Sequence, residues 1–143
     1  MSKHIIGEKD NQYRYKVWME QATFDLAAAH ISLNNSFFEW SCFQSQQAAE
    51  KALKALIAYH GKSVPKVHKL GVLVGMIKSF EYRLRGIHID ISELQSYTFI
   101  TRYPFLIPGE AKTPHKYIKK EEAEICIKKA TIILNLIQGL LDE

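Results

Sequence analysis

The segment with the clearest chemical character is Arg102-Tyr103-Pro104, which follows Tyr97 by a few residues. An arginine presents a planar fork of N–H donors that fits phosphate oxygens, and a tyrosine ring presents a flat face on which a base can stack. An arginine near a helix C-terminus can also simply complement the helix dipole. The pattern therefore leaves open a site for a polyanion and an ordinary basic loop.

A second polar pattern lies between positions 37 and 60, a stretch without glycine or proline. Its polar residues recur at helical spacing beside small alanines: Gln46, Gln47, Glu50, Lys51 and Lys54. Glu50 and Lys54 stand in the favourable i,i+4 order, which is worth about 0.3–0.5 kcal/mol on a helix surface. The stripe is either a solvated face or a functional face, and these residues alone favour the solvated face.

The six histidines give no metal-binding pattern, because none stands at ligand spacing from another histidine, a cysteine or a carboxylate. Glycine-rich phosphate loops, zinc-protease motifs and hydrolase motifs are also absent from the sequence. His68 follows a proline-containing segment and opens a helix, where capping of backbone groups is favoured over catalysis. We predict no metal and no cofactor.

Helices must position these candidates, since apolar residues recur every three or four positions and no segment alternates like a strand. The predicted helices span residues 13–33, 37–60, 68–84, 90–102 and 119–141. We predict an all-α fold, an antiparallel four- to five-helix up-down bundle, in one domain over residues 1–143. Residues 1–12 are predicted to be a flexible tail, and residues 104–115, with three prolines, an ordered loop.

Residue types that favour helix ends mark several boundaries. Ser36 with Glu39 three positions later resembles a capping box at the start of the second helix, and Gly61 fits its C-terminal end. Gly71 and Gly75 lie within the third helix, where each glycine costs about 1 kcal/mol relative to alanine. Those glycines suggest a close approach of another element or a backbone open to a ligand.

Composition places the chain among soluble globular proteins, with 47% hydrophobic residues in 143. Residues 1–60 carry six basic and six acidic side chains, and residues 61–143 carry thirteen and nine, which produces the whole net charge of +4. Such a basic bias favours polyanionic partners. Cys42 and Cys126 read as reduced core thiols, and no apolar run is long enough to span a bilayer. We expect a cytoplasmic protein without a membrane anchor.

The stretch QQAAEKALKAL at residues 46–56 resembles the signature of HEPN (higher eukaryotes and prokaryotes nucleotide-binding) domains. Further matches follow in the expected order: Trp18 with Ala22 and Asp25-Leu26, then His68-Lys69-Leu70, then Leu94, Tyr97 and Thr101-Arg102-Tyr103-Pro104, then Tyr117 and Ala123. The resemblance covers roughly residues 13–140. It implies an antiparallel helical bundle, usually dimeric, whose small stand-alone members act with minimal nucleotidyltransferases.

Many other members of the family are metal-independent ribonucleases or toxins that use an arginine, a polar residue, a short spacer and a histidine. The present chain departs from that pattern, because Arg102 precedes Tyr103-Pro104 and His115 is too distant. Arg83 and His88 have four residues between them, but a leucine follows the arginine where a polar residue is expected. We interpret that spacing as chance.

The predicted ligand-binding residues are Arg102, Tyr103, Tyr97, Lys54, Glu50, Gln47 and His68, with no catalytic residue. The leading hypothesis is a non-catalytic HEPN-like module that binds a nucleotide, RNA or a minimal nucleotidyltransferase partner. The alternatives are a metal-independent ribonuclease toxin of a toxin–antitoxin pair and a plain dimerising interaction domain. A homodimer is expected in each case.

Overall fold

A computed structural model describes residues 3–104, 107, 109 and 113–143, and these residues contain α-helices and no strand. The helices are α1 (Lys3–Asn34), α2 (Phe38–Tyr59), α3 (Leu70–Phe80), α4 (Ser92–Ile100), α5 (Pro114–Tyr117) and α6 (Lys120–Leu141), with one 3₁₀ turn, η1 (Tyr82–Leu84). The all-α prediction is confirmed. The loop predicted over residues 104–115 lies partly outside the described residues, and α5 begins at its end.

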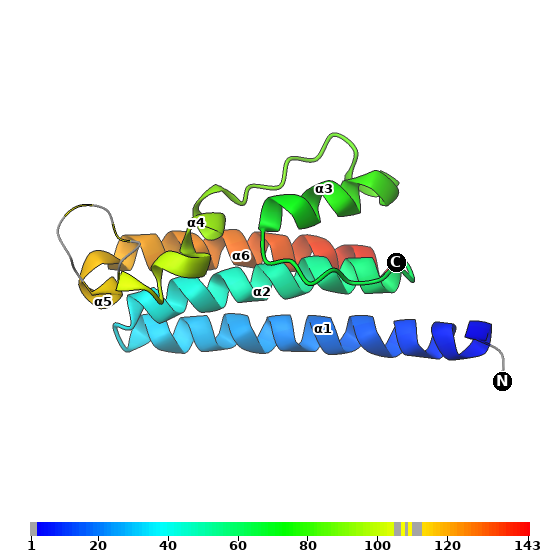
Figure 1. The fold of residues 1–143 in the computed structure, drawn as a ribbon, viewed down its shortest axis with the longest axis horizontal. Coiled ribbons are helices and arrows are strands. Elements are labelled where there is room, and N and C mark those ends of the chain that lie inside the picture. Colours follow the sequence, from blue (N-terminus) through cyan, green and yellow to red (C-terminus); the bar gives the residue numbers. More distant parts are fainter. Residues whose placement is uncertain (1–2, 105–106, 108, 110–112) are drawn as a thin grey trace.

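The three long helices lie side by side, and α2 contacts both α1 and α6 (Figure 1). α3 and α4 pack on α2 on the side opposite to α1. α1 and α2 form the expected antiparallel hairpin, and α6 is antiparallel to α1. α6 runs in the same direction as α2, because the chain returns along the bundle between α3 and α4 (Figure 1). The segment before α3 and the whole of α4 are therefore brought against one face of α2.

The turn between α1 and α2 shows how the hairpin closes. Ser36 adopts a left-handed conformation with φ of 65°. The Phe37 amide donates to the Ser32 carbonyl at 2.8 Å, and the Ser36 amide donates to the Leu33 carbonyl at 3.1 Å, which is the Schellman pattern. The predicted capping box with Glu39 is wrong, since Ser36 ends α1 instead and α2 begins without a side-chain cap.

α2 ends in the same Schellman pattern, here with a glycine at the position of positive φ. Gly61 has φ of 74°, its amide donates to Ala58, and the next amide, of Lys62, donates to Ile57. The predicted C-terminal end at Gly61 is therefore confirmed. This turn directs residues 62–69 back along α2 toward the start of α3 (Figure 1).

α1 begins at Lys3, ten residues before the predicted start at Tyr13. The predicted start of the first helix is therefore wrong: no proline precedes Tyr13, and a single Gly7 costs only about 1 kcal/mol in a helix. Residues 1–2 of the predicted tail lie outside the described residues.

α2 is the central helix of the fold, and most of its residues are buried. Leu53, Leu56 and Ile57 are fully buried and contribute to one hydrophobic core with residues of α1, α3, α4 and α6. Cys42 and Cys126 are both buried free thiols in this core, as predicted. α2 therefore cannot present an ordinary solvated face, and its polar residues must find partners inside the protein.

Candidate functional site

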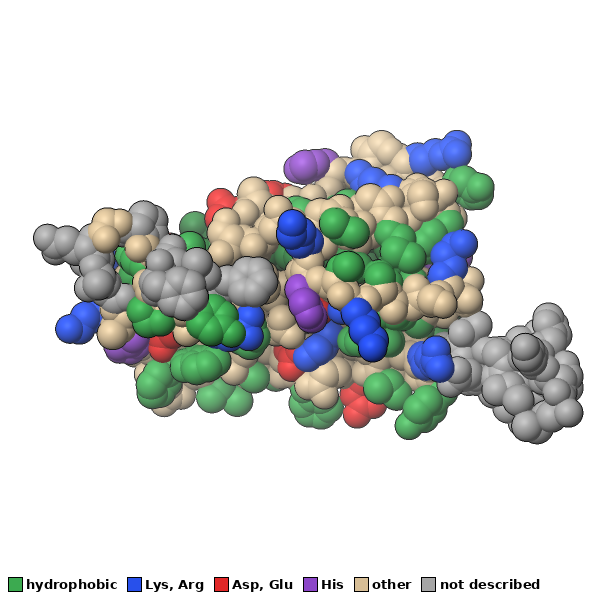
Figure 2. All heavy atoms as spheres, viewed as in Figure 1, with side chains coloured by type: hydrophobic (Ala, Val, Ile, Leu, Met, Phe, Trp, Pro, Cys, Tyr) green, Lys and Arg blue, Asp and Glu red, His purple; other side chains and the backbone are tan. Residues whose placement is uncertain are grey.

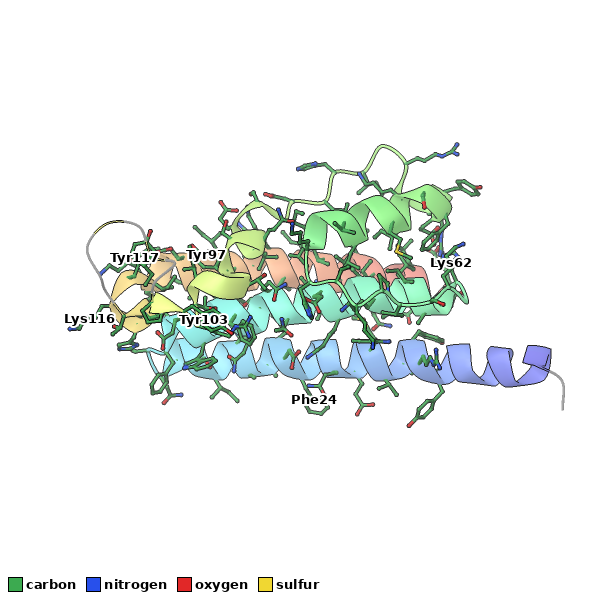
Figure 3. All side chains as sticks on the ribbon, in the orientation of Figure 1. Phe24, Lys62, Tyr97, Tyr103, Lys116 and Tyr117 are labelled. Atoms are coloured by element: carbon green, nitrogen blue, oxygen red, sulfur yellow. The ribbon has the colours of Figure 1, made fainter. Side chains whose placement is uncertain are left out.

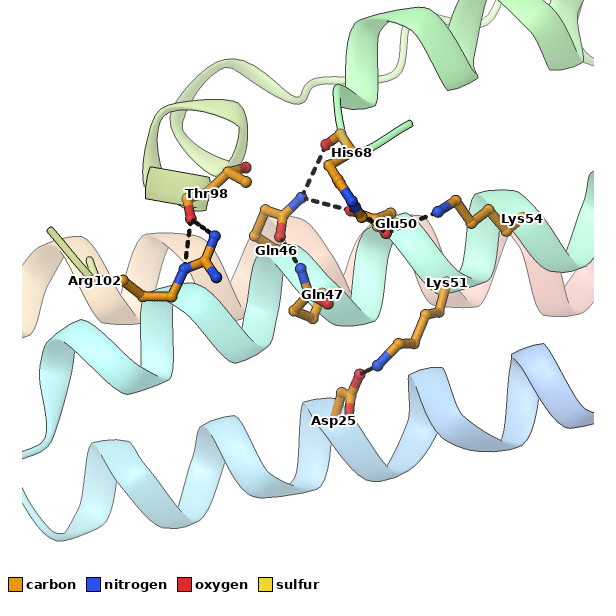
Figure 4. Close-up of polar contacts among 9 residues, drawn as sticks. All are labelled: Asp25, Gln46, Gln47, Glu50, Lys51, Lys54, His68, Thr98 and Arg102. Carbon is orange, nitrogen blue, oxygen red and sulfur yellow. Dashed lines mark hydrogen bonds and ion pairs between the residues drawn. The ribbon is translucent and has the colours of Figure 1, made fainter. Parts of the chain in front are cut away.

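The polar residues of α2 converge on the carboxylate of Glu50, which is 3% exposed (Figure 4). Lys54 Nζ donates to Glu50 Oε2 at 3.0 Å, and Gln46 Nε2 donates to Oε1 at 3.3 Å. His68 Nδ1 lies 3.2 Å from Oε2, although it comes from the segment that precedes α3. The solvated-face interpretation is wrong, because that segment and α1 cover the stripe.

The buried Glu50–Lys54 ion pair has further polar and aromatic contacts. Lys54 is 4% exposed, and its ammonium also lies 5.5 Å from the centre of the Trp18 ring of α1. A buried charge pair is tolerable only when additional hydrogen bonds and polarisable groups replace the lost water. Lys51, which is less buried, pairs with Asp25 of α1 at 2.5 Å, as the sequence suggested.

The same network fixes His68. Gln47 donates to the Gln46 side-chain oxygen at 2.7 Å, and Gln46 Nε2 donates to the His68 carbonyl at 3.3 Å. With Glu50 accepting a hydrogen bond from Nδ1–H, the other ring nitrogen, Nε2, is the one available to a ligand. The His68 side chain is 64% exposed, so a buried frame holds a ring that reaches the surface.

A groove of about 650 Å³ lies beside that ring, between the segment before α3 and helix α4. Its lining residues are Lys66, Val67, His68, Lys69, Val72, Gln95 and Thr98. Figure 2 shows lysine, arginine and histidine side chains gathered over the middle of this face. Two lysines and a histidine on a concave surface give it a positive character.

Gln95 connects the two walls of the groove. Its side-chain oxygen accepts a hydrogen bond from the Gly71 amide at 2.8 Å, and a Cβ at position 71 would lie only 3.0 Å from that oxygen. Gly71 therefore favours the close approach that the sequence suggested, because a larger residue would make Gln95 shift. Gly75 has no such neighbour within 4 Å, so that interpretation does not extend to it.

Arg102 lies next to the α4 wall of the groove (Figure 4). Its Nε and Nη2 atoms donate to the Thr98 carbonyl at 3.1 and 2.9 Å, and Thr98 lines the groove. The guanidinium is also 4.7 Å from the Phe43 ring centre and 5.3 Å from the Tyr103 ring centre. The exposed Arg102 thus has its guanidinium near two aromatic rings and close to the groove.

The two predicted tyrosines differ in their surroundings (Figure 3). Tyr103 is 40% exposed, whereas Tyr97 is 9% exposed and its hydroxyl donates to Glu122 of α6 at 2.5 Å. Burial, together with that hydrogen bond, raises the pKa of Tyr97 well above its ordinary value. Tyr97 joins α4 to α6 and presents no open face for stacking.

The structure divides the predicted residues into two layers. His68 lines the groove and Arg102 lies beside it, whereas Glu50, Lys54 and Gln47 lie in the network beneath it. Sequence reasoning missed the groove residues Lys66, Lys69, Gln95 and Thr98. The available signal was the cluster of two lysines and a histidine directly after Pro65.

The arginine and histidine with ribonuclease-like spacing, Arg83 and His88, lie outside the groove beside His68. Arg83 donates to Glu81 at 2.8 Å and to Glu143 at 2.8 Å. His88 lines a different groove, of about 410 Å³, whose walls include Lys128 of α6. Neither residue lines the groove beside His68.

Among the described residues, no three His, Cys, Asp or Glu side chains lie close enough together to hold a metal ion. No helix among these residues combines the length and the hydropathy that a bilayer span requires.

Comparison with known proteins agrees with this architecture. A family model described as HEPN domain matches residues 15–140. The chain belongs to the HEPN domain family. It is 30% identical over 134 residues to a Methanocaldococcus jannaschii protein named "Putative toxin MJ1304". The aligned region covers 90% of this chain and 88% of that protein.

Solved structures of related proteins share the fold. Protein TT1696 of Thermus thermophilus superposes with a TM-score of 0.74 and 29% identity over 88% of this chain and 97% of that chain. An HEPN domain protein of Thermotoga maritima gives a TM-score of 0.61 and 26% identity over 88% and 98%. The HEPN resemblance read from the sequence is therefore confirmed over nearly the whole chain.

Proposed function

We propose that this HEPN protein binds the phosphate group of a nucleotide or of RNA in the groove between residues 66–69 and α4. The observation that carries the proposal is the convergence of Lys66, His68 and Lys69 on one concave surface with Arg102 beside it. Phosphate oxygens are the ligand atoms that such donors recognise best. The proposed role is binding without catalysis.

The buried network gives this groove a defined geometry. Glu50 holds the Nδ1 side of His68, and Gln46 holds its backbone. A donor whose position is fixed before binding loses less conformational freedom when the ligand arrives. Arg102 is similarly pre-oriented by the Thr98 carbonyl and by two aromatic rings.

The test is titration of the purified protein with uridine monophosphate and with oligouridylate in the absence of divalent metal. Replacing Arg102 by Ala should remove about 1.5–3 kcal/mol of binding free energy, the usual worth of a charged hydrogen bond. Affinity for the oligonucleotide should also fall steeply with added salt. Lys128→Ala, which removes a lysine from the separate groove on α6, is the matched control.

Unchanged binding in Arg102→Ala and in a Lys66→Ala, Lys69→Ala double variant would contradict the proposal. So would an equal loss in the Lys128→Ala control, because that result would indicate attraction by net charge alone. Metal-independent cleavage lost only in His88→Ala would instead assign a ribonuclease site to the Arg83 and His88 pair.

A toxin is the second candidate, and it is favoured by the name of the 30% identical relative. Controlled expression in a bacterial host should then arrest growth, and Arg102→Ala should relieve the arrest if the groove is responsible. Normal growth at high expression would count against this candidate.

Self-association and a nucleotidyltransferase partner stay predictions. The structural feature that supports self-association is a set of exposed apolar side chains on the outer face of α1 and at the start of α2: Phe24, Ile31, Phe37 and Trp40. Figure 3 shows Phe24 directed away from the bundle. Exposed apolar clusters of this kind mark protein contacts. Light scattering should give a dimer mass for the wild type and a monomer mass for a Phe24→Asp, Ile31→Asp variant.

A further inference from the structure

A second pocket lies on the same segment as the groove but is walled by α1 instead of α4. It has a volume of about 430 Å³ and is lined by Tyr13, Arg14, Val17, Trp18, Ser63 and Val64. The segment from Ser63 to Lys69 thus supplies one wall of this pocket with its first residues and one wall of the His68 groove with its last. The segment therefore separates two concave sites.

The lining of this pocket has a distinct chemistry. Its lining combines two aromatic residues, Tyr13 and Trp18, with Arg14 and two valines. Tyr13 is 70% exposed, so its ring is accessible to a ligand. Aromatic faces with an adjacent arginine favour a planar ring that carries an anionic group, which describes a nucleobase attached to a sugar phosphate.

The two sites are connected through the interior. The Trp18 ring centre lies 5.5 Å from the Lys54 ammonium. Lys54 donates to Glu50, and Glu50 contacts His68 (Figure 4). The pocket wall and the groove wall are thereby held in a fixed relation. The segment from Ser63 to His68 spans at most about 18 Å when fully extended, so one ligand of a few nucleotides can reach both sites.

We propose that the pocket at Tyr13, Arg14 and Trp18 is a base-stacking subsite, and that the ligand is a single-stranded oligonucleotide whose backbone crosses the segment 63–69. One base stacks in the pocket, and a phosphate further along the strand lies in the His68 groove. Lys66, an exposed residue of the crossing segment, provides a positive charge along this path. This inference rests on the proposed function and specifies its ligand.

The experiment uses the fluorescence of Trp18 in a Trp40→Phe background, which leaves a single tryptophan. The probes are a ten-residue oligouridylate and uridine monophosphate. We expect the decamer to quench Trp18 and to bind at least tenfold more tightly than the mononucleotide. Tyr13→Ala should weaken decamer binding at least about fivefold, because one stacking ring is lost, and should weaken mononucleotide binding by less.

Arg14→Ala and Lys16→Ala form a matched pair, since each removes one positive charge from an exposed position on α1 and only Arg14 lines the pocket. Arg14→Ala should weaken decamer binding by more than Lys16→Ala. Equal losses would show that net charge explains the effect, and the subsite would be rejected. An equal loss of mononucleotide and decamer binding in Tyr13→Ala would also reject the crossing path.

The outcome for Arg102→Ala separates this inference from the proposed function. If Arg102→Ala weakens both ligands while Tyr13→Ala affects neither, the phosphate groove stands and the stacking subsite falls. If Arg102→Ala affects neither ligand, the proposed function falls, and the inference falls with it.

Discussion

Glu50 and Glu81 are two buried carboxylates of the same type with different surroundings. Each is 3% exposed, and each lies within 3.2 Å of a histidine ring nitrogen and within 3.0 Å of a lysine or arginine nitrogen. Glu50 lies beneath a groove of about 650 Å³ and supports the exposed ring of His68. Glu81 lies near the C-terminal end of α2, where it contacts His60 and Arg83, and Arg83 in turn pairs with Glu143.

The cation partner makes the main difference. Both oxygens of Glu81 accept hydrogen bonds from the fork of Arg83, which lowers the pKa of Glu81 to about 2, and His60 contributes further. Glu50 has Lys54, a point charge that binds one oxygen, and shares its carboxylate with Gln46 and His68. A buried polar cluster is therefore not by itself a site; what marks Glu50 is the groove that its network supports.

The largest expected effect of a variant is at Glu50. Glu50→Ala should lower the free energy of unfolding by about 3–5 kcal/mol, because it leaves the buried Lys54 ammonium without its carboxylate. Leu53→Ala gives the apolar reference on the same helix, with an expected loss of about 2–5 kcal/mol. Urea unfolding followed by circular dichroism measures both.

Two further variants show whether charge is the cause. The double change Glu50→Ala, Lys54→Met should recover much of the lost stability, since it removes the orphaned charge. Asp25→Ala, which removes a carboxylate from the less buried pair with Lys51, should cost under about 1 kcal/mol. If Glu50→Ala costs no more than Asp25→Ala, the contrast between the fully buried pair and the partly buried pair fails.

Glu81 should dominate the response of stability to acid. Its pKa is lowered from 4.5 in the absence of these contacts to about 2, so the unfolded chain takes up its proton first as the pH falls. The stabilisation is present above pH 4.5 and is lost between about 4.5 and 2. Glu81→Gln should cost about 1.5–3 kcal/mol at pH 7.

The measurement is a series of urea midpoints between pH 7 and pH 3 for the wild type and for Glu81→Gln. The two curves should approach one another as the pH falls, because the wild type loses what the variant already lacks. Parallel curves would show that other carboxylates control the acid response. Screening at the 38% exposed Arg83 side chain makes the lower end of the predicted loss the expected one.

The smallest effects distinguish the two histidines. His68→Ala should change the free energy of unfolding by under about 0.5 kcal/mol, since the side chain is 64% exposed, but it should weaken phosphate binding. His60→Ala should cost about 1 kcal/mol, because its 27% exposed ring bonds Glu81, and should leave binding unchanged. Weaker phosphate binding in His60→Ala, with unchanged binding in His68→Ala, would instead place the ligand site near Glu81.

Local sequence information predicted the helices because helix propensity and apolar spacing act over neighbouring residues. The second helix was placed to within a residue at each end, and Gly61 ended it as predicted. The capping box at Ser36 failed for an equally local reason: the same residue suited the end of α1 and the start of α2, and closure of the hairpin chose the first. The HEPN resemblance was also contained in short motifs.

The sequence by itself determined which residue types lie on α2, including the order of Gln46, Gln47, Glu50 and Lys54. Only the tertiary structure decided that this stripe is buried, because the chain returns along α2 after Gly61 and places His68 on the Glu50 carboxylate. It also separated the two tyrosines, since the packing of α4 on α6 buries Tyr97. Burial and grooves depend on elements distant in the chain, whose contacts no local spacing records.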